Sequence, residues 1–276
     1  MTADPTAQAS ALQCEGAREG SMSVPTPRLR QIKLLRDRVA DWDRYPFNIP
    51  VVQNLSELKL TRRVCFFVGE NGSGKSTLLE AVAEHVGFNR EGGGRNFSRE
   101  TTTSVQSTSP LARALRLSWS KQLTRGFFLR AESFFNMATY LDELQEVDGQ
   151  ALGPYGGRSL HKQSHGQSFM ALLENRFFRQ GFYLLDEPEA ALSPQRQLSF
   201  LLLLHSLLEN NPDIQFIIST HSPMILAYPN SQIVSFDGER LTEITYEQSS
   251  PYSIVHGFLK DPKSYLRHLF AELPLE

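Results

Sequence analysis

One stretch of this chain combines three glycines with a lysine and hydroxyl side chains in an order typical of phosphate binding: Gly69, Glu70, Asn71, Gly72, Ser73, Gly74, Lys75, Ser76 and Thr77. Glycines let successive backbone N–H groups turn inward on a phosphate, and the N-terminus of a following helix adds partial positive charge. Lys75 would contact the β- and γ-phosphates, and the Ser76 hydroxyl would bind Mg²⁺. The stretch therefore predicts a nucleoside triphosphate site.

Two further groups of polar residues follow apolar runs of the kind buried in a parallel sheet. Asp186 and Glu187 come directly after one such run, and His221 comes after the next. Asp186 is expected to hold Mg²⁺ directly or through water, and Glu187 to orient and deprotonate the attacking water. His221 is placed to hydrogen-bond the γ-phosphate. In open α/β sheets ligands bind beyond the carboxyl ends of the strands, so Gly69, Asp186 and His221 should meet at one edge.

These groups require a sheet and helices that hold them in place. The sequence predicts an α/β fold with a mostly parallel core sheet flanked by helices, antiparallel N-terminal strands and an inserted lobe. The first segment, 29–39, alternates in a way that favours an exposed or edge strand. The other expected strands cover residues 58–60, 64–68, 182–185, 214–219, 233–236 and 241–246. Helices are expected from about Lys75, after residue 168, and over about 194–209, 252–259 and 262–273.

Residues 89–150 differ in character from the rest of the chain. They begin with a long polar, turn-rich loop and continue with two strand patterns, at 115–119 and 126–130, and a helical pattern over 132–145. We interpret them as an inserted lobe with its own small sheet and helix.

Composition limits the classes of protein to consider. Lys+Arg 28 against Asp+Glu 30 gives a net charge of −2, so bulk charge does not indicate nucleic acid or an anionic membrane. The only cysteines, Cys14 and Cys65, form no disulfide framework or zinc spacing and fit a cytoplasmic protein. Residues 1–26 are expected to be a disordered leader without a signal peptide, and translation could begin at Met22. No segment is long and apolar enough to span a bilayer.

A proline-punctuated loop at residues 41–50 carries three aromatic residues, Trp42, Tyr45 and Phe47. Such a loop upstream of the phosphate loop could stack an adenine ring. The alternative, in which the aromatics anchor the loop on the core, is at least as well supported.

The order of these motifs resembles that of ABC-type ATPases, which are P-loop NTPases. Their signature, Leu-Ser-Gly-Gly-Gln, is matched here by Ser164, Gly166 and Gln167, whereas Gln163 and His165 depart from it. The resemblance implies ATP and Mg²⁺ as ligands, and two copies that close head to tail around two ATP molecules. Ser164 and the Gly166 amide would then bind the γ-phosphate held by the partner.

Two motifs resemble one branch of that family in particular. Asp-Glu-Pro-Glu at 186–189 and Thr-His-Ser-Pro at 220–223 are similar to the RecF, OLD and SMC-related branch, and most of all to stand-alone bacterial AAA-family ATPases. The resemblance covers about residues 29–275. The lid glutamine of the family is not obvious, because 128–132 occupies its place, and Glu132 or Gln106 could substitute.

The leading interpretation is an ATPase that dimerises on ATP. One alternative is a RecF-like ATPase that acts on DNA through basic residues of the lobe: Arg95, Arg99, Arg113, Arg116, Lys121, Arg125 and Arg130. A transporter subunit with a membrane partner is less favoured, because the segment around the expected lid glutamine departs from that family. A P-loop kinase would usually lack the Glu187 and His221 groups.

Overall fold

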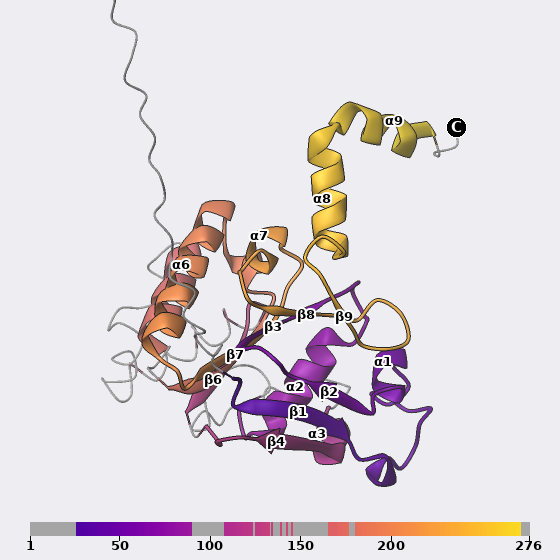
Figure 1. Ribbon diagram of the computed structural model, residues 1–276, viewed down its shortest axis with the longest axis vertical. Coiled ribbons are helices and arrows are strands. Elements are labelled where there is room, and N and C mark those ends of the chain that lie inside the picture. Colours follow the sequence, from indigo (N-terminus) through magenta and orange to yellow (C-terminus); the bar gives the residue numbers. More distant parts are fainter. Residues whose placement is uncertain are drawn as a thin grey trace, which may run out of the picture.

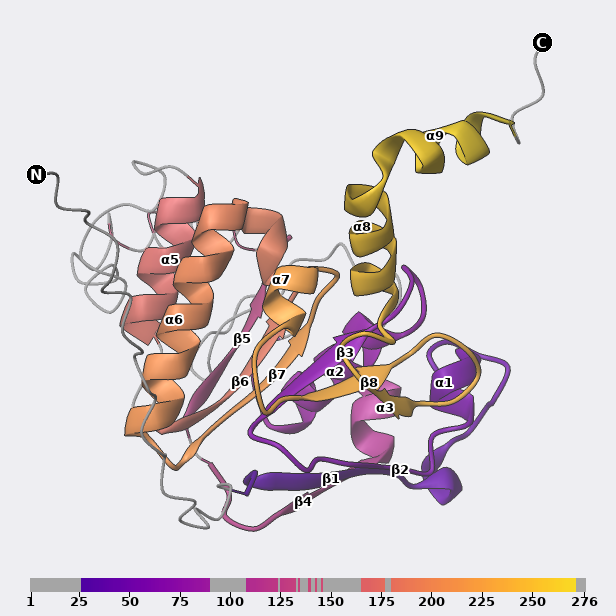
Figure 2. The same cartoon turned by 45° about the horizontal axis from the view of Figure 1, so that its top comes forward.

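The computed structural model describes residues 26–89, 108–123, 125–132, 165–176 and 180–271, with single positions at 134, 139, 142 and 145. Its centre is a six-stranded sheet with the strand order β5-β6-β7-β3-β8-β9 (Figures 1 and 2). The strands are β3 (Val64–Val68), β5 (Gly126–Arg130), β6 (Gly181–Asp186), β7 (Ile214–Ser219), β8 (Gln232–Ser235) and β9 (Thr242–Ile244). All neighbours are parallel except β8 and β9, which confirms the predicted mostly parallel α/β core.

A second sheet of three antiparallel strands has the order β2-β1-β4. Its strands are β1 (Leu29–Leu34), β2 (Glu57–Lys59) and β4 (Leu115–Trp119). The prediction that the first strand is exposed or at an edge is wrong, because β1 lies in the middle of this sheet. A register irregularity between Leu29 and Gln31 shifts the alternation by one residue, so Leu29, Ile32 and Leu34 are all buried.

The predicted lobe does not form a sheet of its own in the part that the structure describes. β4 pairs with β1 in the three-stranded sheet, and β5 pairs in parallel with β6 in the central sheet. The expectation of a separate small sheet is therefore wrong. Most of the predicted helix over 132–145, the polar loop before it and nearly all of the leader lie outside the described residues.

Helices cover both faces of the central sheet. One face carries α5 (His165–Arg176), α6 (Pro194–Asn210) and α7 (Pro223–Leu226), and the other carries α2 (Lys75–His85) and α3 (Ser109–Ala114) above the three-stranded sheet (Figure 2). The remaining elements are α1 (Pro50–Gln53), α8 (Ser250–Lys260), α9 (Pro262–Ala271) and two short 3-10 helices, η1 (Arg36–Arg38) and η4 (Pro188–Ala191).

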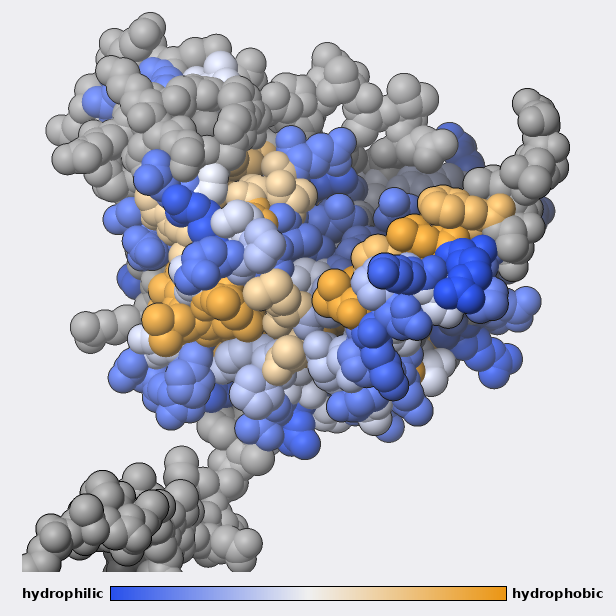
Figure 3. Space-filling view, turned by 90° about the horizontal axis from the view of Figure 1, so that it is seen from above, coloured by the Kyte–Doolittle hydropathy of each residue, from blue (hydrophilic) through white to orange (hydrophobic). Residues whose placement is uncertain are grey.

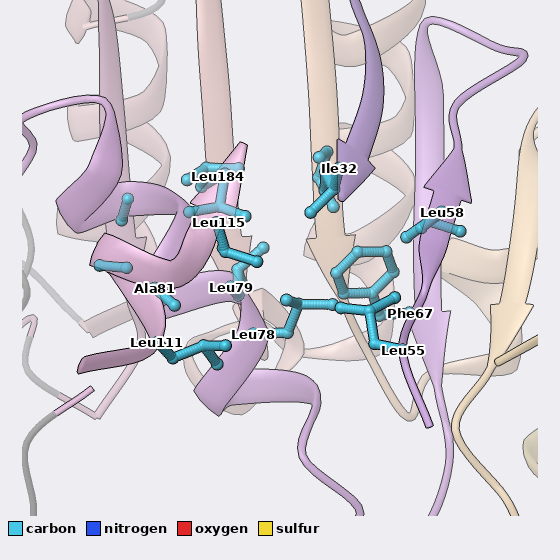
Figure 4. Packing of buried hydrophobic residues seen from close by; sticks show 14 of the residues in the cluster. Ile32, Leu55, Leu58, Phe67, Leu78, Leu79, Ala81, Leu111, Leu115 and Leu184 are labelled. Carbon is cyan, nitrogen blue, oxygen red and sulfur yellow. The ribbon is translucent and has the colours of Figure 1, made fainter. Parts of the chain in front are cut away.

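Side chains along the central strands alternate between the two faces of the sheet, and each face carries one hydrophobic cluster. On β3, Phe66 packs toward the α5 and α6 side, while Cys65 and Phe67 face α2 and the three-stranded sheet. Figure 4 shows the second cluster, in which Phe67, Leu78 and Ile32 come together from a central strand, α2 and β1. Because both faces of β3 are packed, the strand is held in place, and so is the start of the glycine loop that follows it.

Two buried glutamines join the sheets. The side-chain oxygen of Gln215 on β7 accepts hydrogen bonds from the backbone N–H groups of Arg28 (2.9 Å) and Leu29 (2.7 Å), and its amide donates to the Leu29 carbonyl (3.0 Å). Gln232 on β8 similarly bonds the Thr61 N–H (3.0 Å) and the Lys59 carbonyl (3.0 Å). The three-stranded sheet is thus attached to the central sheet by satisfied, buried polar groups.

The last two helices stand away from the rest of the molecule, as Figures 1 and 2 both show. No residue of α8 is buried, and α9 continues from its end at an angle. We call α8 and α9 together the C-terminal arm. Within the described residues, no helix combines the length and apolar character that crossing a membrane requires.

Candidate functional site

The phosphate loop begins where β3 ends and leads directly into α2. Gly69, Gly72 and Gly74 have φ angles of 144°, 81° and 101°, which side chains other than glycine rarely adopt. Gly74 is also closely packed, because a Cβ there would lie 3.0 Å from the side chains of Ile49 and Val51. Glycine is therefore required at this last position for both conformation and space.

Lys75 is only 4% exposed although it carries a charge. Its Nζ donates hydrogen bonds to the carbonyl oxygens of Gly69 (2.6 Å) and Glu70 (3.0 Å), so the ammonium lies inside the loop. Burial lowers the pKa of Lys75, while the nearby carboxylates of Glu187 and Asp186 oppose that shift. The arrangement presents a positive charge where the predicted β- and γ-phosphates would lie.

The two residues predicted to hold Mg²⁺ are neighbours. The Ser76 hydroxyl donates a hydrogen bond of 3.0 Å to Oδ1 of Asp186, which is buried at the end of β6. Burial raises the pKa of the Asp186 carboxyl, and the charge of Arg130 opposes this. A hydroxyl and a carboxylate oxygen are ligands that Mg²⁺ prefers, with phosphate oxygens and water completing its octahedron. The residues present therefore fit the ion that the phosphate loop implies.

Glu187 takes an unusual backbone conformation next to this pair. Its φ is 50° and its ψ 53°, in the left-handed region, and its N–H donates to the Ser219 carbonyl on β7 (2.9 Å). Non-glycine residues in this region are uncommon and cluster at functional sites. The turn leaves the Glu187 side chain 43% exposed at the strand end, where its Oε1 lies 3.5 Å from Nε2 of His221. Glu187 and His221 thus lie together at the carboxyl ends of β6 and β7.

Glu189 has a role that the sequence reasoning did not assign. Its Oε1 accepts a hydrogen bond from the backbone N–H of His221 (2.5 Å), and burial raises the pKa of its carboxyl. Glu189 thereby ties the turn after β6 to the turn after β7. The second glutamate of the Asp-Glu-Pro-Glu motif at 186–189 was the sequence signal that could have indicated this role.

Arg130, at the end of β5, was also missed as a site residue. Its Nε lies 3.5 Å from Oδ2 of Asp186, and its two terminal nitrogens contact Glu80 (2.7 Å) and Glu132 (3.2 Å). Parallel pairing of β5 with β6 places Arg130 opposite Asp186. Arg130 thus lies within 128–132, the segment where the resemblance led us to expect a lid glutamine. Gln106, the other candidate for that role, lies outside the described residues.

These residues surround a pocket of about 510 Å³. It is lined by Ser76, Arg130, Ala131, Glu132, Phe134, Asp186, Glu187, Ala190 and Ala191. The pocket therefore borders the hydroxyl and carboxylates of the site and the turn that leads into α6.

Asp237, just beyond β8, connects the phosphate loop to the C-terminal arm. Its Oδ1 accepts a hydrogen bond from the Glu70 N–H (2.8 Å), and its Oδ2 accepts one from the Ser250 hydroxyl (3.0 Å). Ser250 is the first residue of α8. A single carboxylate thus contacts both the loop and the base of the arm, a link that no local sequence pattern indicates.

The predicted signature lies at the start of α5, of which the structure describes Gly166 and Gln167 but not Ser164. Gly166 packs tightly on the turn after β6, because a Cβ there would lie 2.6 Å from Cδ of Arg196 and 3.2 Å from the Ala191 carbonyl. Ala191 also lines the pocket. The start of α5 therefore lies on the same edge of the sheet as the phosphate loop.

The aromatic loop is anchored on the body of the protein. Phe47 is buried and meets Trp42 edge-on at 6.1 Å between ring centroids, and the Arg36 guanidinium lies 4.1 Å above the Trp42 ring. Phe47 therefore has the anchoring role that the sequence left as one of two alternatives. The Tyr45 hydroxyl lies 3.3 Å from Oγ1 of Thr77, so this loop directly contacts the first turn of α2.

The parallel sheet, the glycine loop at the end of β3 and the acidic end of β6 together form an α/β fold of the P-loop type. Residues 157–226 match the family model described as AAA ATPase domain. This segment includes Gly166, Asp186, Glu187 and His221, whereas the phosphate loop lies outside it.

Solved structures similar to the chain have low sequence identity to it. One is described as a metal-chelate type ABC transporter in an inward-facing conformation (16% identity, 83% of this chain and 89% of that one, TM-score 0.47). Another is the SMC head domain from Thermotoga maritima (17%, 79% and 98%, TM-score 0.41). A third is cbiO1 from Clostridium perfringens, part of the ABC transporter complex cbiONQ (18%, 80% and 88%, TM-score 0.40). The comparison with curated proteins found no match.

Proposed function

We propose that this chain binds ATP with Mg²⁺ in the loop 69–77 and hydrolyses it to ADP and phosphate. The observation that carries the proposal is the 3.0 Å contact between the Ser76 hydroxyl and Asp186, with Glu187 and His221 beside it. A hydroxyl from the phosphate loop and a carboxylate from a neighbouring strand thus share one small space. A glycine turn that binds nothing would not need this convergence.

The chain's own residues account for the chemistry. Lys75 would balance the charge of the β- and γ-phosphates, and Mg²⁺ held by Ser76 and Asp186 would neutralise the phosphate oxygens. Glu187 accepts a proton from water as the water oxygen bonds to the γ-phosphorus and the bond to the β–γ bridging oxygen breaks. His221 lies 3.5 Å from Glu187 and would orient it, and from the same strand end it would donate a hydrogen bond to the γ-phosphate.

We further propose that two copies close around ATP, with Ser164, Gly166 and Gln167 of one copy facing the triphosphate of the other. What supports this is that the start of α5 lies on the same edge of the sheet as the phosphate loop, because a face-to-face pair requires both on one edge. Moving a two-state equilibrium from 1:99 to 99:1 requires a ligand preference of roughly 5.5 kcal/mol. Charge-assisted bonds from both copies to one γ-phosphate could supply this.

Phosphate release from Mg-ATP tests the proposal. Glu187→Gln should lower kcat by about 10²–10⁴-fold while the protein still binds ATP, because only the proton acceptor is lost. Lys75→Ala should abolish ATP binding. Glu239→Gln and Lys59→Ala, which change exposed residues away from the site, are the matched controls. A Glu187→Gln variant as active as the unchanged protein would contradict the assignment.

The alternative of a DNA-acting ATPase has less support once the contacts of the basic residues are known. Of the basic residues expected on the lobe, Arg130 is paired with the site carboxylate Asp186, and Lys121 pairs with Asp213 (2.5 Å). Arg113 and Arg116 are exposed. If DNA is a partner, Arg113→Ala and Arg116→Ala should weaken binding and reduce its dependence on salt. Binding that these changes leave unaltered would remove this alternative.

A further inference from the structure

The large hydrophobic side chains that are exposed in the described part of the chain are confined to three helices. They are Leu198 and Leu202 on α6, Ile254, Val255, Phe258 and Leu259 on α8, and Tyr265, Leu266, Leu269 and Phe270 on α9. Clustered exposed hydrophobic side chains of this kind mark interaction surfaces. We call the α6 pair the leucine patch and the rest the arm patch.

The arm keeps a defined shape although it buries no residue of α8. Phe258 meets Tyr265 edge-on at 5.9 Å between centroids, across the corner between α8 and α9. At the base, Tyr252 packs on Tyr246 at 4.5 Å, and Ser250 donates to Asp237. These contacts brace the arm against the body and against itself. They leave Leu259, which is 68% exposed, without cover.

The leucine patch lies on the outer side of α6. Leu198 and Leu202 are one turn apart, so their side chains stand together, and Leu202 is 71% exposed. The same helix buries Phe200 and Leu204 against the central sheet, so its inner face is already satisfied. The outer leucines add nothing to the core of their own chain.

Both patches lie on one face of the molecule, at opposite ends of that face. Figure 3 looks onto this face and shows hydrophobic surface over α6 on its left side and over the arm on its right. Figures 1 and 2 show that the arm does not reach the α6 of its own chain. A two-fold axis lying in this face, between the patches, would bring the arm of each copy opposite the α6 of the other. The symmetric interface would then contain two equal contacts, each between the arm of one copy and the leucine patch of the other.

We propose that the arm of one copy docks on the leucine patch of a second copy of this chain. The partner is a second copy because the chain itself carries the complementary apolar surface, at the position that two-fold symmetry requires. The inference rests on the proposed function in one respect: Asp237 joins the phosphate loop to the base of the arm, so the docked arm would hold the ATP-bound pair together.

Sedimentation of the full chain, with Mg-ATP in a Glu187→Gln background, tests the proposal. The arm variant carries Leu259→Ser and Leu269→Ser, and the patch variant carries Leu198→Ser and Leu202→Ser. Each variant should raise the dissociation constant of the dimer at least tenfold. All of these side chains are exposed, so both variants should fold, which ATP binding by the monomer checks independently. Loss of dimer with unchanged ATP binding supports the docking.

A mixture of the two variants gives the sharpest result. A mixed pair keeps one intact arm on one intact leucine patch, whereas either variant with itself keeps none. The mixture should therefore dimerise more tightly than either variant alone. Two outcomes would overturn the docking even if the unchanged chain hydrolyses ATP. One is a patch variant that dimerises like the Glu187→Gln protein, and the other is a mixture that dimerises no more tightly than its components. A chain that stays monomeric but binds phosphatidylglycerol vesicles through the arm would overturn it as well, whereas a failure to bind ATP would count against the proposed function.

Discussion

Asp186 is a buried carboxyl whose ionisation depends on two opposing neighbours. It has a hydroxyl on one side, from Ser76, and a guanidinium on the other, from Arg130. Burial raises its pKa and Arg130 lowers it, so the arginine keeps the carboxylate charged and able to bind a cation. Arg130 therefore influences the acid sensitivity of the site.

Replacing Arg130 with glutamine should shift the acidic limb of the ATPase pH profile to higher pH. The sign follows from charge: without the guanidinium the pKa of Asp186 rises further, and protonation then removes the Mg²⁺ ligand at a higher pH. The pH dependence of kcat/KM at saturating Mg²⁺ measures this. Arg116→Gln, an exposed change outside the site, is the control. A limb that stays in place would show that Arg130 does not act through Asp186.

The residues of the phosphate loop could be predicted from sequence because they are contiguous and chemically constrained. Asp186, Glu187 and His221 were predictable as well, since each follows a buried strand. Arg130, Glu189 and Asp237 were not, because each acts through a partner distant in sequence. Such partners follow from strand pairing, which no local pattern reveals.

At the scale of elements, the short segments with strong patterns were predicted well. β3, β6 and β7 and the helices α2 and α6 lie where the sequence placed them. β1 was wrong because a one-residue irregularity reverses which side chains are buried. The strands of the predicted lobe were assigned to a separate sheet because their partners, β1 and β6, lie far away along the chain.

The junction of the phosphate loop and α2 provides a test at this scale. Gly74→Ala combines an unfavourable φ, worth about 1–2 kcal/mol, with a clash against Ile49 and Val51. Gly72→Ala has a similar φ cost, but no atom lies within 4 Å of the added Cβ. ATP affinity, measured by calorimetry, should therefore fall much more for Gly74→Ala. Equal losses would show that conformation alone, and not space, requires glycine at position 74.

The whole molecule depends on the attachment of its two sheets. β1 is joined to β7 through the Gln215 side chain, which satisfies one carbonyl and two N–H groups. Burying such groups without partners costs about 1–3 kcal/mol each. The attachment matters for function because α2, which carries Lys75 and Ser76, packs between the two sheets.

Gln215→Ala should lower the free energy of unfolding by about 2–4 kcal/mol, because partial access of water offsets some of the lost hydrogen bonds. Urea denaturation followed by circular dichroism measures this. Gln195→Ala, at an exposed position of α6, is the matched control and should change stability little. A change below about 0.5 kcal/mol for Gln215→Ala would show that the sheets hold together without this residue.

Asp237 has a consequence for how a second copy and a nucleotide would influence one another. One of its oxygens accepts from the Glu70 N–H in the loop and the other from Ser250, where the arm begins. The coupling between two binding events is reciprocal. If ATP increases the affinity of the arm for the second copy by some factor, docking of the arm increases the affinity for ATP by that same factor. A higher concentration of the chain would then favour ATP binding, because it favours docking. ATP titrations at increasing protein concentration should therefore give a steadily tighter apparent affinity.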